Sequence, residues 1–157
     1  MLRCFFFLLI FAALGCNEKK TEPINLVNEK MEVLKADQSF SDMCEEEGMK
    51  AAYMEYIDSN GVLLKPGHLP IVSADAIDYL LRQDDNSYTL NWQPQQAFVA
   101  AAADLAYTYG VYALRPRQAD TVFYGTYVNI WKKQADGRWK FVLDSGNEGI
   151  GVDSTSF

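Results

Sequence analysis

The sequence changes character near residue 85, and this change limits the folds open to it. Apolar residues follow helical spacing from Leu26 to Arg82, whereas residues 88–145 hold few helix signals and many β-branched and aromatic residues. Helices first and strands afterwards predict an α+β domain, with helices packed on one face of a bent antiparallel sheet.

Three helices are predicted in the first part. The first begins at Leu26 and ends before Gly48, with its apolar side formed by Val27, Met31, Leu34, Phe40 and Met43. The second covers residues 49–57 and the third residues 73–82, with a short strand at residues 62–64 between them. The second part predicts four strands, near residues 90–101, 105–114, 122–133 and 139–145, with a hairpin turn at residues 134–137.

The N-terminal segment has the layout of a secretory signal. Arg3 precedes an apolar run at residues 4–14, which is shorter than the about 20 residues that span a membrane. The run ends in Ala13-Leu14-Gly15-Cys16, which resembles the lipobox read by lipoprotein signal peptidase, although Ala13 stands where leucine is commoner. The alternative is an ordinary signal peptide that contains a cysteine.

We therefore expect an exported bacterial lipoprotein, held to the bilayer by acyl chains on Cys16 and located in the cell envelope, on the periplasmic or the surface side. The predicted divisions are a signal peptide at residues 1–15, a lipidated tether at 16–24, one domain at 25–148 and a flexible tail at 149–157.

Charge and cysteine content narrow the function classes. The chain carries 14 basic and 21 acidic residues, a net charge of −7, and has no basic stripe, so nucleic acid is not an expected partner. If Cys4 leaves with the signal and Cys16 is lipidated, Cys44 is the one remaining thiol and forms no intramolecular disulfide. Its apolar neighbourhood favours a buried structural cysteine over a nucleophile.

Three segments resemble a domain family of unknown function, numbered 4440. Residues 103–112 read ADLAYTYGVY and are similar to its GDLAYTYG segment, with Ala103 where the family has glycine. Residues 125–147 read GTYVNIWKKQADGRWKFVLDSGN and resemble its last hairpin, and residues 51–67 fit the helix and strand before its third helix. That family belongs to the nuclear transport factor 2-like superfamily, with the ketosteroid isomerases and SnoaL-like cyclases. The resemblance implies a conical fold that encloses one pocket.

The hairpin sequence predicts which side chains share a face. If Lys133 pairs with Arg138, then Asn129 faces Val142 and Tyr127 faces Asp144. One face then holds Tyr127, Asn129, Trp131, Val142 and Asp144, and the other holds Val128, Ile130, Trp139, Phe141 and Leu143. Both faces are largely apolar, and a two-layer domain covers only one, so the second either meets a partner, with a homodimer as the expectation, or is an exposed patch.

The resemblance implies which face lines the pocket. Asn129 falls where the isomerases keep an acid that donates to the oxyanion, so the Asn129 face is expected inside. The same comparison places their catalytic aspartate at Lys65 and their oxyanion tyrosine near Ser41. An ammonium and a hydroxyl cannot perform these two roles by the same mechanism, so ketosteroid isomerisation is not expected.

Two acids are catalytic candidates. Asp144 lies among aromatic residues, where a charged carboxylate is poorly solvated, and Asp104 precedes a strand. Each also has a structural interpretation, Asp144 as a cap of the turn at residues 145–147 and Asp104 as a turn residue. His68 has no cluster of ligands around it and is interpreted as a loop residue rather than a metal ligand.

Trp92, Tyr127 and Trp131 are expected to line an apolar ligand site, although aromatic residues at alternating spacing also form ordinary core. Tyr107 and Tyr109 are assigned to neither face.

Two functions follow. The first is an envelope protein that binds a small, mostly apolar molecule or a protein partner in or around the pocket. The second is an enzyme of the cyclase, dehydratase or isomerase type that uses Asp144 or Asp104. The sequence calls for no metal and no cofactor in either case.

Overall fold

The computed structural model describes residues 25–150; the predicted signal peptide, Cys16 and residues 151–157 lie outside this range. The chain forms, in order, α1 (Leu26–Glu47), α2 (Met49–Tyr56), β1 (Ile57–Leu64), β2 (Ile71–Val72), α3 (Ser73–Arg82), β3 (Tyr88–Val99), β4 (Leu105–Pro116), β5 (Phe123–Lys133) and β6 (Trp139–Glu148). The predicted helices and the four later strands are confirmed, and the third helix has the predicted bounds.

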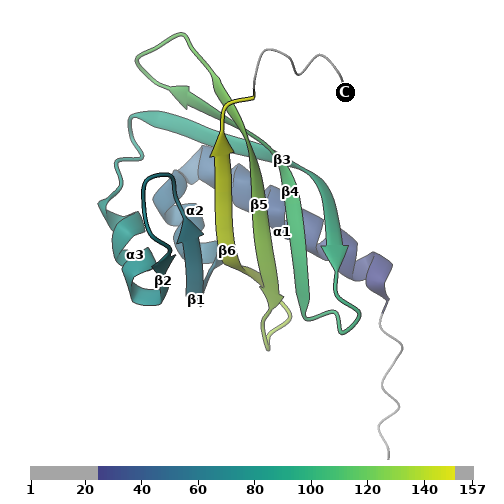
Figure 1. Ribbon diagram of the computed structural model, residues 1–157. Coiled ribbons are helices and arrows are strands. Elements are labelled where there is room, and N and C mark those ends of the chain that lie inside the picture. Colours follow the sequence, from purple (N-terminus) through teal and green to yellow (C-terminus); the bar gives the residue numbers. More distant parts are fainter. Residues whose placement is uncertain (1–24, 151–157) are drawn as a thin grey trace, which may run out of the picture.

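The strands form one sheet in the order β2-β1-β6-β5-β4-β3, and the helices lie on one face of it (Figure 1). This arrangement confirms the α+β class. The sheet is mixed rather than antiparallel, because β1 pairs with β6 in parallel. Sequence patterns missed this pairing because it joins strands from opposite ends of the domain. They also missed β2, which is two residues long and carries no alternation.

The buried side of α1 agrees with the predicted one only in part: Phe40 is buried, and Leu34 and Met43 pack against the core. Val27 and Met31 are 71% and 61% exposed, so their assignment to the core was wrong. The residues that face the sheet are Val33, Asp37, Phe40, Ser41 and Cys44. Two of these five are polar, and a hydrophobic pattern cannot recognise a helix face whose centre is an acid and a serine.

Cys44 is a buried core residue, as expected. It is 3% exposed and forms no disulfide within residues 25–150. Burial, together with nearby carboxylates, raises the pKa of its thiol to about 12, so the thiolate form is disfavoured and the residue acts as an apolar filler.

The register of the last hairpin corrects the predicted faces. Lys133 pairs with Trp139, and Asn129 pairs with Asp144 instead of Val142. A bulge leaves Val142 as an extra residue, because Ile130 pairs with Leu143 while Trp131 pairs with Phe141.

One extra residue reverses the inside–outside alternation beyond it. Trp139 and Phe141 therefore lie in the core, 5% and 0% exposed, and do not belong to the outer face to which they were assigned. Val142 is partly buried and leaves the predicted pocket face.

The glycine-to-alanine difference in the resembling segment falls in the turn before β4. Ala103 has φ +56°, the left-handed conformation that favours glycine, so alanine is held there at a cost of about 1 kcal/mol.

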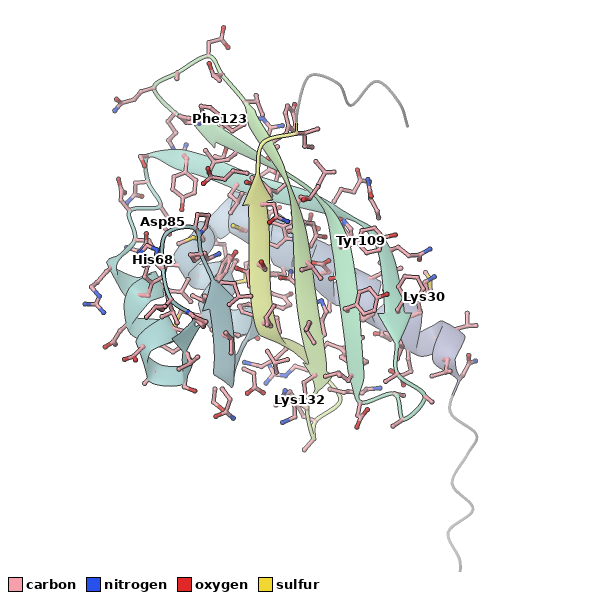
Figure 2. The ribbon with its side chains drawn as sticks, in the orientation of Figure 1. Lys30, His68, Asp85, Tyr109, Phe123 and Lys132 are labelled. Atoms are coloured by element: carbon pink, nitrogen blue, oxygen red, sulfur yellow. The ribbon has the colours of Figure 1, made fainter. Side chains whose placement is uncertain are left out.

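The outer face of the sheet, away from the helices, carries an apolar patch. Tyr107 and Tyr109 point outward, next to Ile130 and Val128 on the neighbouring strand. Figure 2 shows Tyr109 on this face. The outer apolar patch consists of Phe98, Leu105, Tyr107 and Tyr109, each 40–49% exposed, with partly buried Val128, Ile130 and Leu143.

Residues 25–150 contain no helix that is both long and apolar enough to cross a membrane.

We propose that two copies of the domain pair through the outer apolar patch. Face-to-face packing about a two-fold axis would cover the patch of each copy with that of the other. A fragment from Asn25 to Phe157, which contains every residue of the described core, should sediment as a dimer at micromolar concentration. Tyr109→Glu places one charge from each copy in the interface, so this variant of the fragment should sediment as a monomer. Leu69→Glu, at a site 86% exposed in a loop, is the control and should leave the dimer intact. A monomeric unsubstituted fragment would exclude this pairing.

Candidate functional site

A cavity of about 230 Å³ opens between the inner face of the sheet, α2 and the end of β1. Most of its wall is apolar or aromatic, and its polar groups gather on one side. The residues that line it are Tyr53, Lys65, Pro66, Leu90, Trp92, Tyr112, Leu114, Tyr127, Asn129, Asp144, Gly146 and Glu148. A concave, mainly apolar site with a few convergent polar groups is the usual form of a small-molecule site.

The polar side of the cavity centres on Asp144. The Lys65 Nζ lies 2.5 Å from Asp144 Oδ1, and the side chains of the two residues are 23% and 8% exposed. The Tyr53 hydroxyl donates to Asp144 Oδ2 over 3.3 Å. Asn129 is oriented by its surroundings: its amide nitrogen donates to Asp144 Oδ2 (3.1 Å) and to the carbonyl of Val128 (3.3 Å), whereas the reverse orientation would place its oxygen against these two acceptors. Three side chains thus hold one carboxylate.

Sheet pairing explains how these residues meet. Asn129 and Asp144 are cross-strand partners in β5 and β6. Leu63 pairs with Asp144 in the parallel β1–β6 ladder, and Lys65, two residues beyond Leu63, emerges on the same side of the sheet. The parallel pair that the sequence patterns missed is therefore what supplies Asp144 with a cation.

Tyr53 is a fixed donor in this cluster. Its ring is buried, 4% exposed, and burial raises the pKa of its phenol well above the usual value, with the neighbouring Asp144 charge adding to the shift. The phenol therefore stays protonated and keeps its hydrogen bond to Asp144.

A second buried acid holds the aromatic wall in place. Asp37 on α1 is 0% exposed and accepts hydrogen bonds from Trp92 Nε1 and from the Tyr127 hydroxyl, both over 2.8 Å. Ser41, one helical turn later, both donates to the Trp92 carbonyl and accepts from the Trp92 N–H, each over 2.7 Å. The position and rotation of the Trp92 ring are thus set by α1.

Burial raises the pKa of Asp37, and the hydrogen bonds from Trp92 and Tyr127 oppose that rise. Among the described ion pairs none involves Asp37, so no cation offsets its burial. Burial and the adjacent Asp37 also raise the pKa of Tyr127, which keeps that phenol a donor. The sequence patterns missed Asp37, and neither Tyr53 nor Lys65 was among the predicted pocket residues.

Two glycines make room for the rings that line the cavity. A Cβ on Gly110 would lie 2.1 Å from the Gln93 carbonyl oxygen and 2.9 Å from the Tyr127 ring. A Cβ on Gly125 would lie 2.3 Å from the Tyr112 ring. Gly110, in the segment that resembles family 4440, is therefore explained by packing: a side chain there would clash with its neighbours.

The predicted pocket residues separate into two groups. Trp92, Tyr127, Asn129 and Asp144 line the cavity. Trp131 does not: it is 0% exposed, belongs to the core behind the cavity, and donates through Nε1 to Thr108 Oγ1 over 2.8 Å. Val142 leaves the pocket face because of the bulge described above.

Asp104 is removed from the catalytic candidates. Its side chain is exposed, away from the cavity, and its carbonyl oxygen accepts from the Lys133 N–H where β4 begins. This contact agrees with the turn interpretation.

The alternative interpretation of Asp144, as a cap of a turn at residues 145–147, was wrong. The predicted turn at residues 145–147 is part of β6, with Ser145 opposite Val128 and Gly146 opposite Tyr127, so no turn needs a cap there.

His68 lies in an exposed loop, where its Nδ1 is 3.0 Å from the Pro66 carbonyl oxygen. Residues 25–150 hold no group of three or more His, Cys, Asp or Glu side chains placed to bind a metal ion.

Comparison with solved structures identifies the fold. A ketosteroid isomerase-like protein from Erwinia carotovora atroseptica is 16% identical, with a TM-score of 0.58 over 76% of this chain and 95% of that one. An NTF2-like protein from Novosphingobium aromaticivorans is 12% identical, with a TM-score of 0.64 over 82% and 87%. An NTF2-like superfamily protein from Salmonella enterica serovar Typhimurium is 10% identical, with a TM-score of 0.63 over 85% and 99%.

These likenesses show that the chain has the nuclear transport factor 2-like fold, as the resemblance implied. No protein-family model and no curated protein matches the sequence.

Asp37 should give the domain a recognisable pH dependence of stability. Its pKa is raised in the folded state above the ordinary 3.8, so the folded domain holds this proton more tightly than the unfolded chain. As the pH rises above 3.8, the Asp37 contribution to the free energy of unfolding should fall until the folded carboxyl has ionised. Urea unfolding of the parent and Asp37→Asn, from pH 4 to pH 8, should show a parent-minus-variant difference that decreases with pH.

Asp42→Asn, on the exposed side of the same helix, serves as the control and should show no such trend. A parent-minus-Asp37→Asn difference that is flat, or that grows with pH, would contradict the assignment.

Proposed function

We propose that this protein is an exported bacterial lipoprotein whose domain binds a small, mostly apolar molecule in the cavity. One observation carries the binding function: a cavity of about 230 Å³ with an apolar and aromatic wall, and with its buried polar groups on one side. Such a wall supplies contact area, and the polar side orients the guest. Compared with a protein partner, a small molecule fits a concave site of this size better.

The composition of the polar side favours binding over isomerisation. Lys65 stands where the resembling isomerases keep their catalytic base, and an ammonium held at 2.5 Å by a carboxylate does not abstract a proton from carbon. Ser41, near the place of their oxyanion tyrosine, directs its hydroxyl to the Trp92 backbone instead of the cavity. The likeness to a ketosteroid isomerase-like structure therefore extends to the fold and not to this chemistry.

The second candidate function is a cofactor-free enzyme with Asp144 as general acid or base. The place of Asp144 on the cavity wall favours it. A general base, however, needs a lone pair directed at its substrate. Both oxygens of Asp144 already accept hydrogen bonds, from Lys65 on one side and from Tyr53 and Asn129 on the other. These contacts make Asp144 a holder of Lys65, so binding ranks first.

Filling the cavity should abolish binding without unfolding the domain. Gly146 lines the cavity, and a Cβ there would meet its nearest neighbour, the Tyr112 ring, at an ordinary 3.6 Å. Gly146→Leu should therefore fold but occupy the space of the guest, whereas Gly146→Ala should keep it open. We expect the uncharged fluorophore N-phenyl-1-naphthylamine to brighten with the parent and with Gly146→Ala, and to lose at least tenfold in affinity for Gly146→Leu.

Circular dichroism and the melting temperature report whether each variant is folded. If folded Gly146→Leu binds the fluorophore as tightly as the parent does, the cavity is not the binding site.

The anchor is tested in cells. Cys16 follows an apolar run too short to span a membrane, so a lipid on Cys16 is the proposed attachment. The parent should incorporate radiolabelled fatty acid and enter the detergent phase, and Cys16→Ser should do neither. Cys44→Ser is the matched control and should be labelled like the parent. Labelling that persists in Cys16→Ser would exclude the anchor.

A further inference from the structure

The hydrogen-bond donors on the cavity wall are almost all in use. The Tyr53 hydroxyl donates to Asp144, and the Tyr112 hydroxyl donates to the Asn147 carbonyl over 3.4 Å. The remaining wall donors follow the same rule: the Tyr127 hydroxyl and Trp92 Nε1 both donate to Asp37, and the Asn129 amide donates to Asp144 and Val128. None of these groups has a donor left for a guest.

Lys65 is different. An ammonium has three N–H donors, and within residues 25–150 the one hydrogen bond from Lys65 Nζ goes to Asp144. Two donors are thus left, on a side chain that lines the cavity and is 23% exposed. Asp144, in turn, accepts three hydrogen bonds, from Lys65, Tyr53 and Asn129, which leaves about one of its four lone-pair sites for a donor on the guest. The polar side of the cavity therefore offers hydrogen-bond donors, and a guest that binds there needs a hydrogen-bond acceptor.

Charge decides between a neutral and an anionic acceptor. Asp144 already balances the charge of Lys65 at 2.5 Å, and Glu148 adds a further carboxylate where β6 ends at the cavity. No other cation belongs to the described lining. A carboxylate guest would bring another negative charge to this partly desolvated side, whereas a carbonyl oxygen would accept from Lys65 without that repulsion.

We propose that the natural guest is an uncharged, mostly apolar molecule whose carbonyl oxygen, or an equivalent neutral acceptor, binds the free N–H donors of Lys65. This inference rests on the proposed function and adds to it the chemical class of the guest. Leu90, Leu114 and Pro66 contact the apolar body, and the rings of Trp92 and Tyr127 flank it. Lys65 is then the specificity-determining residue, and Asp144 is the positioning residue that holds it.

Four probes with one two-ring body separate the possibilities: 2-acetylnaphthalene, 2-ethylnaphthalene, 2-naphthoate and 2-naphthylmethylammonium. Their affinities for the full chain in lipid nanodiscs are measured by calorimetry, with empty nanodiscs titrated as the blank. The neutral ketone should bind about tenfold more tightly than the hydrocarbon, as one hydrogen bond to a charged donor provides. It should also bind more tightly than either charged probe.

Two variants assign the preference to Lys65. Asp144→Asn leaves Lys65 without its counter-charge, so the affinity for 2-naphthoate should rise at least tenfold relative to the ketone. The double variant Lys65→Met/Asp144→Asn removes both charges together, which avoids an unpaired buried carboxylate. Its preference for the ketone over the hydrocarbon should be smaller than that of the parent, because the carboxamide introduced at position 144 is a neutral and therefore weaker donor than the ammonium. Lys35→Met, an exposed lysine on α1, is the control and should keep the parent's order of affinities.

The outcomes separate this inference from the function on which it rests. Equal binding of ketone and hydrocarbon by the parent, or a preference for 2-naphthoate or the ammonium probe, overturns the assignment of the guest and leaves the binding function standing. Binding of none of the four probes overturns both.

Discussion

The docking of α1 on the sheet through Asp37 is the interaction on which the rest of the structure depends. This carboxyl lies at the centre of the domain and joins the helix to β3 through Trp92 and to β5 through Tyr127. Burying a carboxyl without a cation is costly, and hydrogen bonds from the two donors offset that cost only while both rings keep their positions. The helix, the curvature of the sheet and the aromatic wall of the cavity are therefore fixed together.

A second constraint comes from the sheet order. Parallel pairing of β1 with β6 closes the side of the domain opposite β3 and places Lys65 against Asp144. Hairpins alone would leave Asp144 a buried acid with hydrogen-bond donors but without a cation, and would make it a more credible base. With Lys65 present, the same carboxylate becomes half of a held ion pair. The role of one residue thus changes with a strand pairing between segments almost 80 residues apart.

The fold itself does not specify an activity, since the solved structures of this shape include an isomerase-like protein and proteins described only by their superfamily. The function has to be inferred from the site itself. On its wall, the side-chain hydrogen-bond donors bind other groups of the protein, except for those of Lys65. Binding of a guest follows from such a wall more directly than proton transfer does. The proposed binding domain needs no catalytic group, and the proposed lipid anchor rests on the resemblance of residues 13–16 to a lipobox.

By itself the sequence determined the class of the fold and the order of its long elements, because these depend on local periodicity and on turn residues such as those at 134–137. Four of the residues that line the cavity were also predicted, but only the family resemblance indicated which face of the sheet lies inside. The sequence predicted the α1 core face only in part: Phe40 is buried as predicted, but Asp37 and Ser41 were missed, since they are polar and are buried only because Trp92 and Tyr127 bind them. It predicted the β5–β6 register wrongly, since a bulge leaves no mark on alternation until the paired strand is known. The tertiary structure alone decided that Lys65 faces Asp144, because a contact between distant segments is set by the packing of the whole sheet and not by the residues on either side of it.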